Sequence, residues 1–247
     1  MQLAETLPQP SSMPPPKLDA PCKEERAAVE AFPETILLLG TDAAGKNHVA
    51  RVWMRRMEAL GLEPRMQESW LVSPAVDGEA EEKKSALSHL AEAVFLAVFP
   101  WIAGFLPLAL RFLIRRDARR FRSDGQRRLI VSHSALRILA FTLGARGQGI
   151  DALSESTRSA IRELCERSGA RVIVLDVDHA VRQQRIEARL ERGDSDPFDR
   201  YMLADPVRSE RIEACLVSIA TELMDAHLVV NNDLDDDALW AELERAR

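Results

Sequence analysis

Residues 36–47 read Ile36-Leu-Leu-Leu-Gly40-Thr-Asp-Ala-Ala-Gly45-Lys46-Asn47, and this run predicts how the rest of the chain is arranged. Four apolar residues that suit a buried strand lead into two glycines, and a lysine follows at the start of a helix. Such a loop aims backbone N–H groups and the positive helix N-terminus at an anion, while Lys46 reaches the outer phosphates of a nucleotide. The pattern asks next for Ser or Thr, whose hydroxyl holds Mg²⁺, and this sequence has Asn47 instead.

The run therefore predicts a phosphate cradle. An ordinary strand-to-helix turn with an exposed lysine is the alternative, and Asp42 alone is also suited to cap the helix that follows. The residues assigned to the cradle are Gly40, Thr41, Asp42, Ala43, Ala44, Gly45, Lys46 and Asn47.

Further strands and helices alternate after the cradle, as hydrophobic periodicity and capping residues indicate. This alternation predicts an α/β fold with a five-stranded parallel sheet in three layers, with ligands bound at the carboxyl ends of the strands. The later strands are expected at 65–72, 128–132, 171–176 and 228–231, the helices at 46–61, 135–143, 154–168, 179–191, 205–225 and 235–247, and a flexible loop at 144–149.

The segment 86–122 has a different character. Residues 93–110 carry no charge, Pro100, Gly104 and Pro107 interrupt them, and six arginines follow. A single membrane crossing would separate the cradle from the third strand, and two crossings need about 20 apolar residues each. We therefore expect an apolar helical hairpin that is inserted in the domain. It dips into one leaflet of an anionic membrane, binds a partner protein, packs on its own domain, or forms a homodimer interface.

Composition limits the number of domains, the class of protein and the cellular compartment that we expect. A length of 247 residues with 46% hydrophobic residues fits one domain, predicted at 25–247, behind a proline-rich, disordered arm at 1–24. The net charge of −6 argues against a nucleic-acid binder. Three widely spaced cysteines suit a reducing compartment, and the start of the sequence lacks the pattern of a secretory signal, so we expect a cytoplasmic protein, or one peripheral on the cytoplasmic face of a membrane.

Several motifs, taken in order, resemble those of thymidylate kinases and related nucleoside-monophosphate kinases. Gly40-Thr-Asp-Ala-Ala-Gly-Lys is similar to the family's cradle, and Leu175-Asp-Val-Asp with Arg185-Ile-Glu-Ala-Arg189 is similar to its passage from strand to lid. Asp194-Ser-Asp-Pro-Phe-Asp199 resembles the end of the lid, and Val230-Asn-Asn-Asp233 the last strand with its adenine-side loop. The resemblance spans about residues 34–247 except 73–127, and it implies a P-loop NTPase fold.

The resemblance also implies a function and its residues. It implies transfer of the γ-phosphoryl group of Mg-ATP to a nucleoside monophosphate or similar phosphorylated acceptor. Lys46, Arg189 and Arg192 would then be catalytic. Asp42, Ser132 and His133 would lie at the substrate, and Asn47 and Asp176 near the metal, through water.

Three positions depart from the family's pattern. Ser132-His133 stands where the family has an Asp-Arg pair, Asn47 replaces the hydroxyl residue, and Pro197 replaces a lid arginine. Removing one positioned charge can lower a phosphoryl-transfer rate by on the order of 10²–10³-fold. The alternative is a nucleotide-binding pseudokinase that recruits a membrane or a partner through residues 86–122.

Overall fold

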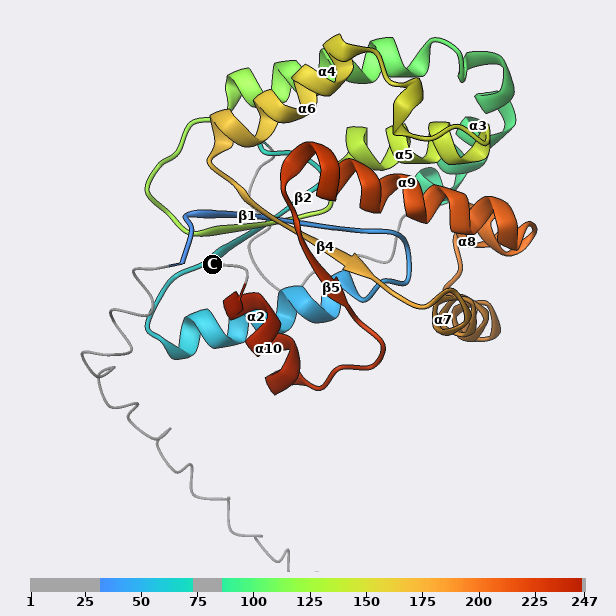
Figure 1. The fold of residues 1–247 in the computed structure, drawn as a ribbon. Coiled ribbons are helices and arrows are strands. Elements are labelled where there is room, and N and C mark those ends of the chain that lie inside the picture. Colours follow the sequence, from blue (N-terminus) through green and yellow to red (C-terminus); the bar gives the residue numbers. More distant parts are fainter. Residues whose placement is uncertain (1–31, 73–85, 246–247) are drawn as a thin grey trace, which may run out of the picture.

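The computed structural model describes residues 32–72 and 86–245, so the predicted arm at 1–24 lies outside the described residues. The chain forms an α/β fold around a five-stranded sheet in which every pairing is parallel (Figure 1). The order across the sheet is β2-β3-β1-β4-β5, which places β1 at the centre. The predicted parallel sheet is confirmed, with strands β1 (Thr35–Gly40), β2 (Arg65–Glu68), β3 (Arg128–Val131), β4 (Arg171–Asp176) and β5 (His227–Val230).

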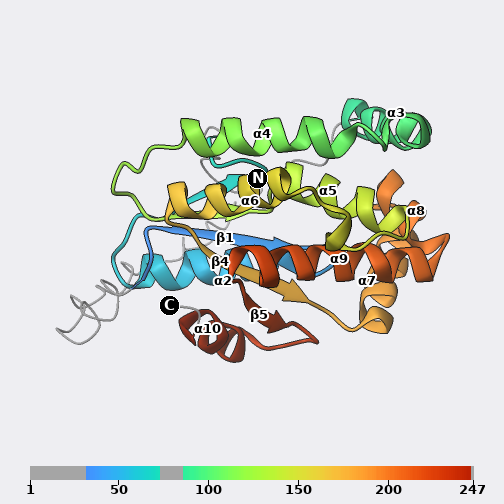
Figure 2. The same cartoon turned by 45° about the horizontal axis from the view of Figure 1, so that its top comes forward.

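Helices cover both faces of the sheet, which is compatible with the predicted three-layer fold (Figure 2). Side chains of β1 alternate between the faces: Ile36 and Leu38 pack with α2 and α10, and Leu37 and Leu39 with α4, α5, α6 and α9. A central strand covered on both sides must be apolar throughout, as β1 is. These helices are α2 (Lys46–Ala59), α4 (Leu106–Arg120), α5 (Ser134–Ala145), α6 (Glu155–Ser168), α9 (Pro206–Met224) and α10 (Asp236–Arg245).

Three further helices lie toward the carboxyl end of the strands: α3 (Ala86–Ile102), α7 (His179–Arg192) and α8 (Pro197–Leu203). Figure 1 shows α7 and α8 beyond the arrowhead of β4. An aromatic cluster joins α3, α5 and α8, with the ring centroids of Phe99 and Phe141 4.8 Å apart and those of Phe141 and Phe198 5.5 Å apart. The end of the sheet where ligands are expected is therefore bordered by packed helices.

Two predicted boundaries are wrong. The strand expected at 65–72 stops at Glu68, because Ser69 adopts a left-handed conformation with φ of 71° and turns the chain. The flexible loop expected at 144–149 begins later, because Gly144 and Ala145 continue α5. Gly144 faces the backbone of Ile212 on α9, so it allows the two helices to pack closely. Helix α5 ends only after Ala145.

Helix α8 was not expected. Its signal is the run Asp196-Pro197-Phe198-Asp199, in which Pro197 occupies the first turn and the two aspartates form a capping box. Asp196 accepts a bond from the backbone N–H of Asp199 at 2.8 Å, and Asp199 accepts from that of Asp196 at 3.3 Å. Pro197 was interpreted only as the replacement of a lid arginine, although proline is common in the first turn of a helix.

Within the segment 86–122 the structure has two helices, α3 and α4. They are bent by 119° at a short break, which falls at residues 103–105, between Pro100 and Pro107. Pro100 lies inside α3, and Pro107 stands in the first turn of α4, where a missing N–H costs nothing. Among the described residues, no single helix is long and apolar enough to cross a membrane, and this bent pair meets the length and composition requirement only when its two parts are combined.

Candidate functional site

The glycine loop lies between the central strand and α2. Gly45 has φ of 87° and is the N-cap of α2, where it offers no side chain to the first-turn N–H groups. A Cβ at this position would lie 2.5 Å from Nδ2 of Asn231, so both backbone conformation and space require glycine. Ala43 also adopts a left-handed conformation, with φ of 63°. The loop therefore curls tightly, and the N–H groups that begin a helix remain directed at its mouth.

Lys46 folds back over this loop. Its Nζ donates to the carbonyl oxygens of Gly40 at 2.9 Å and Thr41 at 2.5 Å. The ammonium group is thus held where the strand ends and the loop begins. Asn47, the next residue, is exposed on the first turn of α2. The predicted cradle residues are contiguous in space, with the lysine drawn over the loop and Asn47 at its outer border.

A buried ion pair supports the loop from behind. The hydroxyl of Thr41 donates to Oε1 of Glu213 on α9 at 3.1 Å, and Oε2 of Glu213 lies 3.1 Å from Nε of Arg182 on α7. Arg182 is fully buried and also donates to the hydroxyl of Ser209. Burial raises the pKa of Glu213, while Arg182 and Thr41 oppose that shift. Sequence reasoning missed Glu213, whose only signal is a carboxylate at an apolar position of an amphipathic helix.

Asp42 forms an ion pair on the β3 side of the loop. Both of its carboxylate oxygens lie 2.8 Å from Nη2 of Arg137, which projects from the first turns of α5. The two side chains are 22% and 35% exposed, so the pair is accessible to a ligand. Sequence reasoning did not single out Arg137, although it lies only six residues after β3, where the ligand end of a parallel sheet is expected.

Ser132 and His133 follow β3 but differ in surroundings. Ser132 is buried in a left-handed conformation with φ of 71°, and its hydroxyl has no hydrogen-bond partner among the described residues. His133 is fully buried: Nδ1 accepts from the N–H of Leu136 and caps α5, and Nε2 lies 3.2 Å from Oδ2 of Asp117. Asp117 also accepts from the N–H of Leu71 at 2.8 Å. A substrate contact at His133 would need these bonds rearranged, and it stays a prediction.

On the β4–β5 side, the loop borders a hollow of about 520 Å³, a volume within the usual range for small-molecule sites. It is lined by Ala43 and Gly45 of the loop, the arginines of α7, and residues that follow β5. The predicted residues Arg189 and Arg192 thus line the same hollow as Ala43 and Gly45 of the loop. The complete lining is Ala43, Gly45, His48, Arg185, Ala188, Arg189, Arg192, Asn231, Asp233 and Leu234.

The three arginines of this hollow are held differently. Arg185, which the sequence analysis quoted without a role, donates to the carbonyls of Ala43 and Asn231 at 3.2 and 3.0 Å and pairs with Asp233 at 2.8 Å. Arg189 lies 3.6 Å from Oδ1 of Asp199. Arg192 is 62% exposed and pairs only loosely, at 3.6 Å, with an aspartate that is equally exposed. Positions 185, 189 and 192 share one helix face, so α7 presents a row of cations beside the loop.

Asp199 is almost fully buried. Burial raises the pKa of this carboxyl, the charges of Asp196 and Asp42 raise it further, and Arg189 opposes them. Two carboxylate–guanidinium pairs therefore lie near the loop, Asp42 with Arg137 and Asp199 with Arg189.

The proposed metal contacts do not form a cluster. Among the described residues, no three His, Cys, Asp or Glu side chains converge as metal ligands. Oδ1 of Asp176 accepts from the N–H of Val177 at 2.9 Å, and Asn47 is exposed on α2. The loop and its arginines fit a phosphate group held by nitrogen donors. The assignment of Asn47 and Asp176 near a metal stays a prediction.

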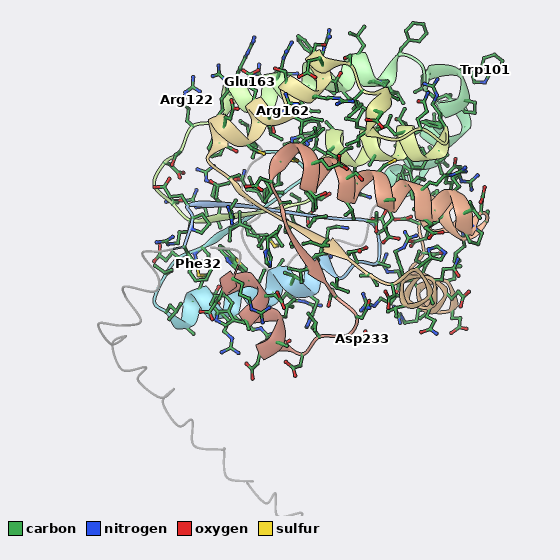
Figure 3. All side chains as sticks on the ribbon, viewed as in Figure 1. Phe32, Trp101, Arg122, Arg162, Glu163 and Asp233 are labelled. Atoms are coloured by element: carbon green, nitrogen blue, oxygen red, sulfur yellow. The ribbon has the colours of Figure 1, made fainter. Side chains whose placement is uncertain are left out.

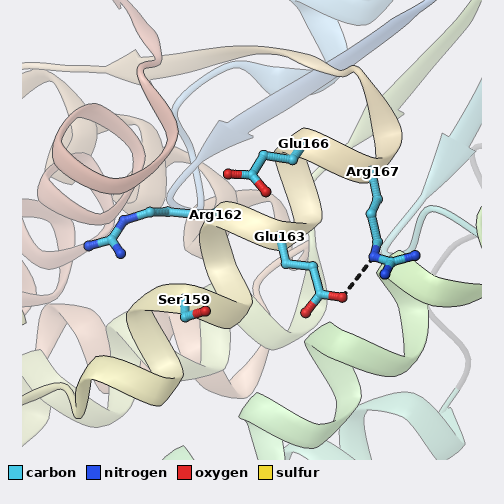
Figure 4. A pocket seen from close by; sticks show the side chains of 5 residues that line it. All are labelled: Ser159, Arg162, Glu163, Glu166 and Arg167. Atoms are coloured by element: carbon cyan, nitrogen blue, oxygen red, sulfur yellow. Dashed lines mark hydrogen bonds and ion pairs between the residues drawn. The ribbon is translucent and has the colours of Figure 1, made fainter.

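A second hollow, of about 530 Å³, lies along α6 (Figure 4). Its lining consists of charged or small polar side chains of that one helix, and Arg167 pairs with Glu163 at 2.7 Å. Because Arg162 also pairs with Glu155 on the same helix, and this surface pairing accounts for both arginines, we assign no function to this hollow.

No protein-family model matches this sequence, and no curated protein is similar enough to be detected.

Proposed function

We propose that this protein is an ATP-binding P-loop kinase of the thymidylate-kinase type, which transfers the γ-phosphoryl group of Mg-ATP to a nucleoside monophosphate or similar phosphorylated acceptor in the cytoplasm. One observation carries the proposal. The glycine loop joins the central strand of a parallel sheet to α2, and a hollow lined by three arginines opens directly beside it. Carboxyl ends of central parallel strands are where open α/β sheets bind ligands.

The loop and α7 would hold the donor. The first-turn N–H groups of α2 and the ammonium of Lys46 would face the β- and γ-phosphates, and Arg189 and Arg192, which line the hollow beside the loop, would contact the same phosphates. Phosphoryl transfer spreads negative charge over the oxygens of the moving group, so prepositioned cations lower its barrier. Mg²⁺ accompanies ATP and takes most of its ligands from phosphates and water.

The acceptor would lie on the other flank of the loop. Strand β3 neighbours β1 opposite β4, so Asp42, Arg137 and Ser132 are on the side away from the hollow. A guanidinium suits an acceptor phosphate, and a carboxylate suits a sugar hydroxyl. When an acceptor phosphate takes Arg137, it releases Asp42 to orient the attacking molecule.

Nucleotide binding without turnover is the second candidate. Asn47 supplies no hydroxyl for Mg²⁺. This change weakens metal-assisted transfer more than it weakens phosphate binding. The same loop, Lys46 and arginines would then hold a nucleotide without transferring its phosphoryl group.

A calorimetric titration of the full chain with ATP and Mg²⁺ tests the shared step. Lys46→Ala should lower the affinity about tenfold or more, because it removes charge-assisted bonds to phosphate. Arg55→Ala is the matched control, since it removes a cation from the exposed face of the same helix, where Arg55 pairs with Asp236. Wild-type protein that binds no nucleotide, or Lys46→Ala that binds as wild type does, would refute the proposal.

Turnover separates the two candidates. Incubation with ATP, Mg²⁺ and a panel of nucleoside monophosphates should yield ADP and a phosphorylated acceptor, and Lys46→Ala should abolish both products. Tight ATP binding with no ADP above the Lys46→Ala background would favour the pseudokinase.

A further inference from the structure

Helices α3 and α4 carry most of the large apolar side chains that the protein exposes. Seven of the eleven large apolar side chains that are exposed among the described residues fall within residues 90–112, so exposed apolar side chains are concentrated in this one segment. We call this group the α3–α4 apolar face. Its members are 41–85% exposed, and they are Leu90, Val94, Val98, Trp101, Phe105, Leu108 and Phe112.

The spacing of these residues places them on one side of each helix. Leu90, Val94, Val98 and Trp101 on α3, and Leu108 and Phe112 on α4, are three or four residues apart, which is the repeat of a helix surface. Phe105 lies in the break between the two helices. The opposite side of α3 carries Phe95 and Phe99, which pack on Phe141 with ring centroids 6.0 and 4.8 Å apart. A group of exposed apolar side chains as large as the one on the outer side marks an interaction site. The inner side of α3 is covered by its own domain, and the outer side requires another covering.

The apolar face continues into positive charge. Arg116 follows Phe112 by four residues on the same side of α4, and three more exposed arginines follow at the end of the helix, Arg119, Arg120 and Arg122. Within the described residues, Arg116 and Arg120 form no ion pair, while Arg119 lies 3.7 Å from a carboxylate of α6. Figure 3 shows Trp101 and Arg122 at opposite ends of the same upper edge of the molecule.

Negative charge is absent from the exposed side of this segment as the structure describes it. Residues 90–122 contain two carboxylates, and Asp117 is buried against His133. Glu92 lies on the side of α3 opposite Leu90 and Val94, and it is partly buried. The whole chain has a net charge of −6, so its acidic groups are elsewhere and this surface is locally cationic. A second copy placed face to face would bring arginines together without a carboxylate to pair them.

We propose that the α3–α4 apolar face docks on an anionic phospholipid surface. Its aromatic side chains would lie in the interfacial region, where Trp is favoured, and the arginines would contact anionic headgroups. The two helices form the outermost layer of the domain (Figure 2), so a planar surface can meet both without disturbing the packed core. Helices of this kind bury their apolar side about 5–10 Å into the boundary between headgroups and acyl chains. The binding is separate from the nucleotide site and goes beyond the function proposed above.

Vesicle flotation of the full chain tests this docking. We expect binding to vesicles of phosphatidylcholine with about 30% phosphatidylserine, less binding to phosphatidylcholine alone, and weaker binding when salt rises from about 0.1 to 0.5 M. The double variant Trp101→Ala/Phe105→Ala should lower the partition coefficient about tenfold or more. Arg116→Gln/Arg120→Gln should lower it severalfold on anionic vesicles and leave binding to neutral vesicles unchanged.

Matched control variants show whether the loss of any exposed apolar side chain or any surface arginine lowers vesicle binding. Val207→Ala removes an apolar side chain that is 62% exposed on α9, and Arg55→Gln/Arg56→Gln removes two surface arginines from α2; neither should change flotation. Trp101→Phe should keep binding but lose most of the fluorescence quenching caused by brominated acyl chains, which reports direct contact between Trp101 and lipid.

Three outcomes would overturn the proposal. They are failure of the wild type to bind anionic vesicles, equal binding by the double variants and their controls, and quenching that survives in Trp101→Phe. A concentration-dependent dimer that the Trp101→Ala/Phe105→Ala variant abolishes, without vesicle binding by the wild type, would assign the face to a second copy of the chain instead. Lys46→Ala should float as wild type does, so failure of docking and failure of nucleotide binding are distinguishable.

Discussion

Replacing Gly144 with alanine should separate the two helices that support the glycine loop. A Cβ at Gly144 on α5 would lie 2.4 Å from Cα and 2.5 Å from the backbone nitrogen of Ile212 on α9. Ordinary contacts at such a Cβ are 3.4–4 Å, so the helices must move apart by about 1 Å. Because the obstacles are backbone atoms, no change of rotamer relieves the clash.

The magnitude follows from two opposing effects. Overpacking of a close helix contact costs about 3 kcal/mol at the upper end of its usual range, and alanine regains about 1 kcal/mol over glycine inside a helix. The free energy of unfolding should therefore fall by about 2 kcal/mol, which corresponds to a decrease in melting temperature of roughly 4–8 °C for a domain of this size. Thermal and urea unfolding, followed by circular dichroism, measure both quantities.

The matched control is Gly149→Ala, five residues along the chain. Gly149 has φ of −93° and nothing within 4 Å of its would-be Cβ, so alanine there should leave stability unchanged or slightly higher. Adding Ile212→Ala to Gly144→Ala removes the contact with the side chain of Ile212 at 2.7 Å but leaves both backbone contacts. This addition should not restore wild-type stability. A Gly144→Ala protein that melts within about 1 °C of wild type would refute the reasoning.

The same substitution should affect the loop. Ile212 precedes Glu213, which accepts from the hydroxyl of Thr41, and α5 carries Arg137, which holds Asp42. Moving α5 from α9 therefore displaces both supports. ATP affinity should fall in Gly144→Ala and stay unchanged in Gly149→Ala, as measured by the same calorimetric titration.

Three other substitutions test the buried polar groups around the loop. Glu213→Gln should lower the free energy of unfolding in urea by about 3–5 kcal/mol, because it leaves the charge of Arg182 buried without its carboxylate; Glu155→Gln, in a surface pair, should change it by less than about 1 kcal/mol. Because burial and the charge of Asp196 raise the pKa of Asp199, the folded protein loses stability as pH rises from the ordinary carboxyl value of 3.8 through the raised pKa. Asp199→Asn should therefore be more stable than wild type at pH 7, and this gain should vanish below the ordinary carboxyl pKa; a gain that is the same at every pH would contradict this cause. Ser132→Gly should stabilise the protein by about 1 kcal/mol, since it relieves a left-handed backbone and removes a buried hydroxyl without a described partner, whereas a lower melting temperature would show that this hydroxyl is bonded.

The sequence predicted the parts of the fold that depend on local pattern. Four consecutive apolar residues before Gly40 predicted the central strand, and the helix expected at 154–168 is present as α6, with Ser154 and Gly169 as its two caps. The end of β2 depends on the left-handed backbone of Ser69, for which serine gives no local signal. Gly144 was interpreted as a loop residue because its real role, close approach to Ile212 on α9, depends on a residue 68 positions further along the chain.

The site was predictable only where its residues are neighbours in sequence. The loop residues 40–47 are contiguous, and Arg189 and Arg192 lie on the face of α7 that borders them. Arg137 and Glu213 were missed because their partners, Asp42 and Thr41, are 95 and 172 residues away in the chain. A single sequence has no pattern that joins such distant positions, since only the order of the parallel strands brings them together.

The position of α3 and α4 in the chain has a consequence for synthesis. The central strand β1 pairs with β3 and β4, and both follow the apolar helices in sequence. After Phe112 leaves the ribosome, the residues up to Val131 at the end of β3 are added at about 5–20 per second, so roughly 1–4 s pass before β1 can pair with β3. Until then both sides of α3 are uncovered, because Phe141, which packs on its inner side, has not yet been made. A nascent chain stalled between α4 and β3 should therefore bind holdase chaperones or lipid more strongly than the finished protein does.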